Sequence, residues 1–179
     1  MIDSDNVSGW FFEGDKLFYK FISDKIPDNG VFVEIGCWLG KSSLYFSSIK
    51  KKNQKLICVD TWEGTPNEIN TNHVLVKHAN VFDLFMKNME GREFEVIKNY
   101  SIEAAKTFED YSLDAVFIDG DHTYDAVRSD ILSWYPKVKI GGYISGHDFG
   151  QDAVREAVLS ILPNAKRFNI EGYCWYLQK

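Results

Sequence analysis

The stretch VFVEIGCWLGKSS, residues 31–43, joins a short apolar run to a glycine-bearing turn and then to a helical pattern. Residues 31–35 are almost all β-branched or aromatic, which indicates a buried strand. The residues after the second glycine begin a helical pattern over 41–51. A strand, a turn and a helix in this order form the first half of a βαβ unit. The sequence therefore predicts an α/β fold.

Further apolar runs follow, and helical patterns separate them. Uninterrupted apolar strands that alternate with helices indicate a parallel sheet buried on both faces. Near the C-terminus, two runs flank Glu171-Gly172 and predict a β-hairpin. We therefore expect a Rossmann-like, doubly wound, mostly parallel sheet that ends in an antiparallel hairpin. The further strands are expected at 55–60, 94–97, 114–119, 142–146, 166–170 and 173–177, and the further helices at 81–89, 101–108, 124–135 and 152–162. Ser101 is the expected N-cap of its helix.

Length and composition are those of one ordinary globular domain. The chain has 179 residues, of which 45% are hydrophobic and 26% charged, and domains usually run to about 100–200 residues. We expect a single domain, 1–179, in three parts. These are an N-terminal helical and aromatic segment (1–29), a cofactor-binding core (30–149), and a helix with the terminal hairpin (150–179).

Net charge, hydropathy and cysteine content indicate which kinds of partner and which location to expect. A net charge of −6 argues against nucleic acid, because phosphate contacts supply most of that affinity. No stretch approaches the roughly 18 apolar residues of a membrane span, and the N-terminus lacks the pattern of a signal peptide. Cys37, Cys58 and Cys174 suggest reduced thiols in a cytoplasmic protein. A small-molecule partner is expected, and self-association is left open.

The first turn differs from a dinucleotide-binding turn. Gly36 and Gly40 are spaced G-x-x-x-G rather than G-x-G-x-x-G, and Trp38 lies where such a turn would close on a pyrophosphate. A ligand with adenosine but no phosphate fits better. Asp60 ends the second predicted strand, where a carboxylate can accept both ribose hydroxyls. Glu34 is an acid inside an apolar strand, and a ligand cation would supply the partner that it needs.

Acids and histidines follow the fourth and fifth predicted strands, in the strings FIDGDHTY and SGHDF. Because neighbouring parallel strands end at the same edge, we expect five side chains to lie together at one rim of the sheet: Asp119, Asp121, His122, His147 and Asp148. Carboxylate oxygens suit Mg²⁺, and a histidine beside them can act as general base. Two structural roles are left open as alternatives: Asp121 as a helix cap and His147 as a loop hydrogen-bonding group.

Four blocks, in order, resemble class I methyltransferases that use S-adenosylmethionine: VEIGCWLGKSS, VDTWEG, FIDGDHTYDAV and GGYISGHDF. The resemblance covers residues 30–149. It is closest to the small-molecule O-methyltransferase-like group that includes the sugar O-methyltransferases of macrolide biosynthesis. It implies S-adenosylmethionine as methyl donor and O-methylation of a small hydroxylated metabolite or sugar.

The resemblance also implies roles for individual residues. Around the donor it places Glu34, Gly36, Trp38, Gly40, Ser42, Asp60, Thr61, Trp62, Ser101 and Asp119. Within this set Asp60 holds the ribose and Ser101 approaches the adenine. In metal-dependent members, acids matching Asp119 and Asp148 bind Mg²⁺, and a histidine matching His122 is the base. Phe149 stands where these members often carry another ligand, so the need for a metal is left open.

Two other functions are alternatives. The missing G-x-G-x-x-G and the terminal hairpin disfavour a nicotinamide-dependent oxidoreductase. A non-catalytic S-adenosylmethionine-binding module would bind the donor without turnover. We expect the aromatic residues 10–12 to fold over the acceptor pocket and the polar stretch 63–78 to form a lid. The sequence does not choose among sugar, phenol and amine acceptors.

Overall fold

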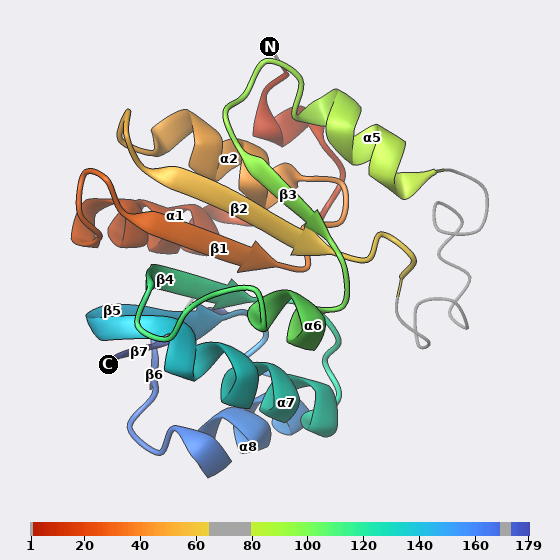
Figure 1. The fold of residues 1–179 in the computed structure, drawn as a ribbon. Helices are drawn as coiled ribbons and strands as arrows, with labels where there is room; N and C mark the ends of the chain where they lie inside the picture. Colours follow the sequence, from red (N-terminus) through yellow and green to blue (C-terminus); the bar gives the residue numbers. More distant parts are fainter. Residues whose placement is uncertain (1, 65–79, 169–172) are drawn as a thin grey trace.

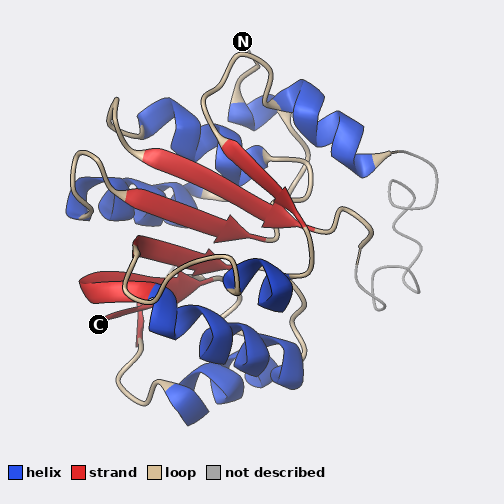
Figure 2. Cartoon of the chain, viewed as in Figure 1, coloured by secondary structure: helices blue, strands red, loops and turns tan. Residues whose placement is uncertain are grey.

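The computed structural model describes residues 2–64, 80–168 and 173–179, and in this part of the chain helices cover both faces of one sheet (Figures 1 and 2). The strands are β1 (Val31–Ile35), β2 (Lys55–Asp60), β3 (Glu95–Lys98), β4 (Leu113–Ile118), β5 (Val138–Gly146), β6 (Lys166–Arg167) and β7 (Trp175–Gln178). The helices are α1 (Glu13–Lys25), α2 (Lys41–Ile49), α5 (Val81–Asn88), α6 (Ser101–Ala105), α7 (Tyr124–Trp134) and α8 (Asp152–Ile161). Short 3₁₀ turns lie at Ser4–Asn6 and Tyr135–Lys137.

The strand order is β3-β2-β1-β4-β5-β7-β6. The first five strands in this order are parallel to one another, whereas β7 runs antiparallel to both β5 and β6. The expected doubly wound, mostly parallel sheet with an antiparallel end is confirmed. No helix in the described ranges is long and apolar enough to cross a membrane.

Side chains along each central strand alternate between two helical layers. Phe32 packs into the layer of α1, α2 and α5, and the next residue, Val33, packs into the layer of α6, α7 and α8. Figure 1 shows these two layers on opposite sides of the sheet. Because successive strand residues point to opposite faces, an uninterrupted apolar run is buried on both sides. The carboxyl ends of the parallel strands are thereby held together at one edge.

Some boundaries differ from those expected. β5 begins at Val138 rather than at Gly142, because the strand continues through an irregular stretch in which Gly141 has a φ of 83°. α6 ends at Ala105, after which the backbone tightens into turns with i→i+3 hydrogen bonds. The expectation that Ser101 is an N-cap is wrong, since Tyr100 occupies that position.

The terminal hairpin is present in its described part. Lys166 pairs with Tyr176, and Arg167 pairs with Trp175. β7 begins at Trp175, later than expected, and it lies between β5 and β6. The predicted turn at Glu171-Gly172 lies outside the described residues.

Candidate functional site

Two cavities open where the parallel strands end. The larger, of about 500 Å³, is lined by Asp60, and we call it the Asp60 cavity. The smaller, of about 450 Å³, is lined by His122, and we call it the His122 cavity. Both are lined by Gly36, Trp38, Asp119 and Gly120. The two cavities therefore share one wall.

Backbone contact between two strand ends builds this shared wall. Gly36 has a φ of 86°, and a Cβ atom there would lie 1.9 Å from the carbonyl oxygen of Asp119. The Gly36 N–H donates to the Val59 carbonyl at 2.9 Å, and the Asp119 N–H donates to the Ile35 carbonyl at 2.9 Å. Only glycine fits so close an approach in this conformation. The turns after β1 and β4 thus meet without an intervening side chain.

Three non-glycine residues around the cavities have left-handed backbone: Trp38 (φ 44°), Trp62 (φ 54°) and Asp148 (φ 57°). Bulky residues rarely adopt this region, and such strain gathers at functional sites. Asp60 supports two of them. Its Oδ2 accepts a hydrogen bond from the Trp38 N–H at 2.8 Å, and its Oδ1 accepts one from the Trp62 N–H at 2.7 Å. Asp60 therefore fixes both turns while lining the larger cavity.

The Asp60 cavity is acidic with apolar walls. Its carboxylates are Asp60, Asp119, Asp121, Asp125 and Asp130. No lysine or arginine lines it among the residues that the structure describes. Such a cavity repels a diphosphate and admits a neutral or cationic ligand.

The residues expected around the donor divide into three groups. Those that line the Asp60 cavity are Gly36, Trp38, Asp60, Thr61, Trp62, Ser101 and Asp119. Ser42 lines the His122 cavity. Gly40 and Glu34 line neither. Gly40 instead precedes α2 in a left-handed conformation, against the ring of Phe85.

Glu34 lies in β1 and is 1% exposed. Its carboxylate accepts hydrogen bonds from the Tyr19 hydroxyl at 2.7 Å and from the Ser43 hydroxyl. Burial raises the pKa of Glu34, and these hydroxyls, with that of Ser42, oppose the rise. Neighbouring hydroxyls thus supply the partners that a buried acid needs. The carboxylate is satisfied without a ligand cation.

Four of the five residues expected at the rim of the sheet line the His122 cavity, namely Asp119, His122, His147 and Asp148, whereas Asp121 lines only the Asp60 cavity. His122 Nε2 is 3.0 Å from Asp148 Oδ2 and 3.6 Å from Asp119 Oδ1. Hydrogen bonding to Asp119 and Asp148 raises the pKa of His122 to about 10. In this arrangement the imidazole is therefore charged at neutral pH.

A buried histidine stands behind the rim. His147 is 8% exposed, and its Nδ1 lies 3.2 Å from Asp148 Oδ2. Its Nε2 lies 3.2 Å from Asp15 Oδ1. Burial opposes the charge on His147, but Asp119, Asp148 and Asp15 outweigh it and raise the pKa to about 11. His147 thus links the rim carboxylate to a deeper one, and hydrogen bonding in a loop is part of its role.

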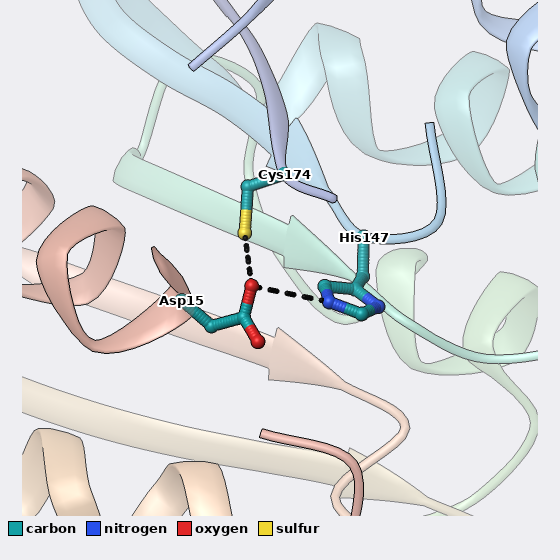
Figure 3. Close-up of side chains that lie close together, drawn as sticks. All are labelled: Asp15, His147 and Cys174. Carbon is teal, nitrogen blue, oxygen red and sulfur yellow. Dashed lines mark hydrogen bonds and ion pairs between the residues drawn. The ribbon is translucent and has the colours of Figure 1, made fainter. Parts of the chain in front are cut away.

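Asp15 is the deeper carboxylate, and Figure 3 shows it between His147 and Cys174. It lies on α1, is 1% exposed, and accepts hydrogen bonds from the Phe12 N–H at 2.8 Å and the Cys174 thiol at 3.5 Å. Sequence analysis did not identify it. A signal was present, because Asp15 has helical spacing with the buried residues of α1, Phe18, Tyr19 and Ile22. An acid on the apolar face of a helix needs a buried partner.

Residues from the N-terminal and C-terminal regions line the His122 cavity. Trp10, Phe11 and Phe12 line it before α1, and Tyr173 lines it before β7. Trp10 stacks on Trp38, with ring centroids 5.2 Å apart and planes at 26°. The aromatic segment 10–12 thus covers the cavity that holds His122.

The rim offers a set of ligands that suits a hard divalent cation. One ligand atom from each of Asp119, His147 and Asp148 lies within 4.8 Å of the others. Two carboxylates from adjacent strand ends are the kind of donor that Mg²⁺ prefers. Phe149 contributes no ligand, since its side chain packs into the layer of α7 and α8.

Two further expectations can be compared with the structure. Thr123, not Asp121, caps α7, because the Thr123 hydroxyl accepts the Ala126 N–H. Asp121 accepts the Thr123 N–H and lines the Asp60 cavity. Of the polar stretch 63–78, residues 65–78 lie outside the described part of the chain.

The profile of a family described as "methyltransferase domain" matches residues 33–149. None of the curated proteins matches the chain. Among solved structures, the O-methyltransferase NovP has a TM-score of 0.66 and 18% identity over 92% of this chain and 78% of that one. An SAH-bound methyltransferase of Podospora anserina has a TM-score of 0.65 and 14% identity, over 97% and 80%. A putative rRNA methylase of Clostridium thermocellum has a TM-score of 0.57 and 14% identity, over 95% and 97%. The TM-scores show that these proteins share the fold of this chain, and at such low sequence identities the similarity shows the fold alone.

Proposed function

This chain belongs to the methyltransferase domain family, and we propose that, as an S-adenosylmethionine-dependent methyltransferase, it methylates a hydroxyl group of a small metabolite or sugar. The observation that carries the proposal is the pair of cavities with a common wall at Gly36 and Asp119. A donor in one cavity and an acceptor in the other would meet at that wall. Holding two reactants in line supplies a large part of the acceleration of a transfer reaction.

We assign the Asp60 cavity to the donor. Its carboxylates attract the sulfonium and ammonium groups of S-adenosylmethionine and repel the diphosphate of a nicotinamide cofactor. Asp60 would accept the ribose hydroxyls, with Thr61 and Trp62 beside it. The methionine end would pass Gly36 and Trp38 at the shared wall and reach Ser42 at the border of the His122 cavity. The charge of the cavity therefore argues against the oxidoreductase alternative.

Two expected donor residues receive an indirect role in this proposal. Glu34 orients Ser43 in the first turn of α2 through a hydrogen bond. Gly40 lets the chain enter α2 at a φ of 84°. Both support the loop that carries Gly36 and Trp38. They shape the donor cavity without touching the donor.

We assign the His122 cavity to the acceptor. The acceptor oxygen attacks the methyl carbon, the carbon–sulfur bond breaks with its electron pair on sulfur, and S-adenosylhomocysteine leaves. His122 is the group that takes the hydroxyl proton, and Asp119 and Asp148 orient its ring. While both acids hold His122 charged, it cannot accept this proton.

Asp119 and Asp148, with His147 behind them, are the residues that would hold Mg²⁺. The closeness of their ligand atoms supports this assignment. Mg²⁺ held there would neutralise much of the charge on the two carboxylates, which would lower the pKa of His122, and it would also lower the pKa of a nearby acceptor hydroxyl. His122 lines the acceptor cavity, where its ring can contact a bound acceptor.

The acceptor cavity suits a small molecule. A volume of about 450 Å³ lies in the usual range for small-molecule sites. Its walls combine the aromatic rings of Trp10, Phe12 and Tyr173 with polar groups at the rim, which suits a ring that carries hydroxyls. A net charge of −6 disfavours RNA as the acceptor, although an rRNA methylase shares the fold. The buried thiols Cys37, Cys58 and Cys174 support a cytoplasmic location.

The test is calorimetric titration of the purified chain with S-adenosylhomocysteine, with and without Mg²⁺, and with NADH as control. We expect micromolar binding of S-adenosylhomocysteine and none of NADH. Binding of NADH alone would contradict the assignment of the donor. Donor binding with no turnover on any hydroxylated acceptor would favour the non-catalytic module instead.

A further inference from the structure

Three buried side chains from distant parts of the chain bring an oxygen, a nitrogen and a sulfur atom together (Figure 3). Asp15 comes from α1, His147 directly follows β5, and Cys174 directly precedes β7. All three are buried, and one ligand atom from each lies within 4.8 Å of the other two. Cys174 has no role in the proposed methyl transfer. The cluster therefore offers a mixed set of ligand atoms that the transfer reaction does not explain.

The spacing of these atoms resembles the edges of a tetrahedral zinc site. Asp15 Oδ1 lies 3.2 Å from His147 Nε2 and 3.5 Å from Cys174 Sγ. Zinc bonds of about 2.0 Å to oxygen and nitrogen and about 2.3 Å to sulfur place an oxygen and a nitrogen ligand about 3.3 Å apart, and an oxygen and a sulfur ligand about 3.5 Å apart. Two of the three spacings in the cluster therefore already fit a zinc ion.

The second polar atom of Asp15 and that of His147 have partners outside the cluster. Asp15 Oδ2 accepts a hydrogen bond from the Phe12 N–H at 2.8 Å, which leaves Oδ1 to face His147 and Cys174. His147 Nδ1 lies 3.2 Å from Asp148 Oδ2. A histidine that binds a metal commonly donates its other ring N–H to a carboxylate, which fixes the ring and raises its basicity. The outer contacts of a metal site are thus in place.

Zinc binding would leave the net charge of this buried cluster unchanged. Asp15 carries a negative charge, His147 a positive one, and the buried Cys174 thiol is neutral. The ion would bind the Asp15 carboxylate, His147 Nε2 and the Cys174 thiolate, and one proton from the histidine and one from the thiol would leave to solvent. Because one doubly charged ion replaces two protons, no uncompensated charge is buried.

The His122 cavity gives an ion a path to the cluster, because His147 lines that cavity. A water molecule from the cavity would supply the fourth ligand. Three protein ligands and one water are the set found at zinc ions with an open position.

A rival group of ligands in the described part of the chain is Glu34, Cys37 and Cys58. It contains no histidine. Both oxygens of Glu34 already accept hydrogen bonds, from the hydroxyls of Tyr19 and Ser43. This group is therefore less suited to a metal than the cluster around Asp15, and its two thiols provide a control.

We propose that Asp15, His147 and Cys174 bind a zinc ion at a site of their own. A thiolate and an imidazole suit zinc, whereas Mg²⁺ prefers the oxygen ligands that Asp119 and Asp148 offer. His147 can serve both places, since Nε2 faces the zinc ligands and Nδ1 faces Asp148. The zinc ion joins α1 to the segments that follow β5 and precede β7. The site does not depend on the methyl donor.

The experiment titrates Co²⁺, which replaces zinc in tetrahedral sites and reveals a bound thiolate by a strong charge-transfer absorption. The full chain, freed of metal with a chelator, is compared with Cys174→Ala and with the matched control Cys58→Ala, which removes another buried thiol. We expect the wild type and Cys58→Ala to bind one Co²⁺ with this absorption and to exchange it for Zn²⁺, which binds more tightly. Cys174→Ala should lose the absorption. Its affinity for Zn²⁺ should fall by more than the roughly 10–100-fold that loss of an outer partner costs.

The other outcomes would overturn the proposal. A wild type that binds no Co²⁺, or binds it without the absorption, would show that the thiol is not a ligand. Retention of the absorption in Cys174→Ala, or its loss in Cys58→Ala, would assign the metal to the rival group. Should Cys174→Ala fail to fold, Cys174→Ser replaces it, because a hydroxyl keeps the hydrogen bond to Asp15, and an unchanged absorption in that variant would contradict the proposal. Titration with S-adenosylhomocysteine tests the proposed function separately.

Discussion

The two cavities differ in which parts of the chain form their walls. All described residues around the Asp60 cavity fall within 35–130, inside the segment 33–149 that the family profile matches. The His122 cavity adds residues 9–12, Gln151 and Tyr173, which lie outside that segment. The cavity that we assign to the donor, called the donor half below, is thus built from a segment shared with other members of the family. The cavity that we assign to the acceptor, called the acceptor half below, is completed by segments outside it, and we expect these to determine which acceptor is methylated.

The largest effect is expected from His122, which should act on turnover alone. Its side chain is 44% exposed, so His122→Ala should leave the fold intact. Turnover should fall by about 10²–10⁴-fold, as is typical for loss of an acid–base group. The affinity for S-adenosylhomocysteine, measured by calorimetry on the same variant, should be nearly unchanged. Equal losses of turnover and donor affinity would contradict the role of His122 as base.

Asp60→Ala should instead weaken binding of the donor. The change removes the proposed ribose contact and the acceptor for the Trp38 and Trp62 N–H groups. We expect the affinity for S-adenosylhomocysteine to fall by about 100-fold. The matched control is Asp125→Ala, an exposed acid of the same cavity, and it should change this affinity much less. An equal loss in both variants would mean that only the net charge of the cavity matters.

Asp15→Asn tests whether α1, through His147, positions the Asp148 carboxylate at the rim of the sheet. The amide cannot hold His147 as an ion pair, so Asp148 should lose its fixed position. We expect the acceptor KM to rise by about ten-fold, the size of effect that loss of one buried charged hydrogen bond produces, with donor affinity unchanged. Asp24→Asn, an exposed acid on the same helix that pairs with Lys20, is the control and should change neither. A lower melting temperature without a change in KM would show that Asp15 is purely structural.

Trp10→Ala should give the smallest effect, and this effect should be confined to the KM for the acceptor. Trp10 is 58% exposed and stacks on Trp38, and such ring contacts contribute about 0.5–1.5 kcal/mol. We expect the acceptor KM to rise about three-fold. Leu17→Ala, which removes another exposed side chain of the N-terminal region, should leave KM unchanged. A larger effect on donor affinity than on KM would mean that the aromatic segment belongs to the donor half.

The sequence predicted the sheet well because its signals are local and periodic. Each apolar run from residue 31 to 146 became a strand, and the runs are short enough to exclude buried helices. The N-cap at Ser101 was mispredicted for a physical reason. A serine at a helix start can cap it, but here a tertiary contact with Trp134 uses the hydroxyl. Capping preferences describe a local alternative and cannot anticipate that contact.

The site was predictable only where strand ends define it. Asp60, Asp119 and Asp148 follow parallel strands, so their convergence at one edge follows from the topology. The need of Glu34 for a partner was also visible, but the partners are hydroxyls from α1 and α2 rather than a ligand. Asp15 lies on a helix before the first strand, and its contact with His147 depends on how that helix packs. Such long-range packing is not encoded in any local pattern.

The most direct test of the two-cavity account is a crystal structure of the chain with S-adenosylhomocysteine bound. The account predicts the ribose hydroxyls within hydrogen-bonding distance of Asp60, and the thioether sulfur at the wall formed by Gly36 and Asp119. The cavity beside His122 should keep room for an acceptor. A nucleoside bound instead between Trp10 and His147 would contradict the account, because the donor would then occupy the cavity assigned to the acceptor.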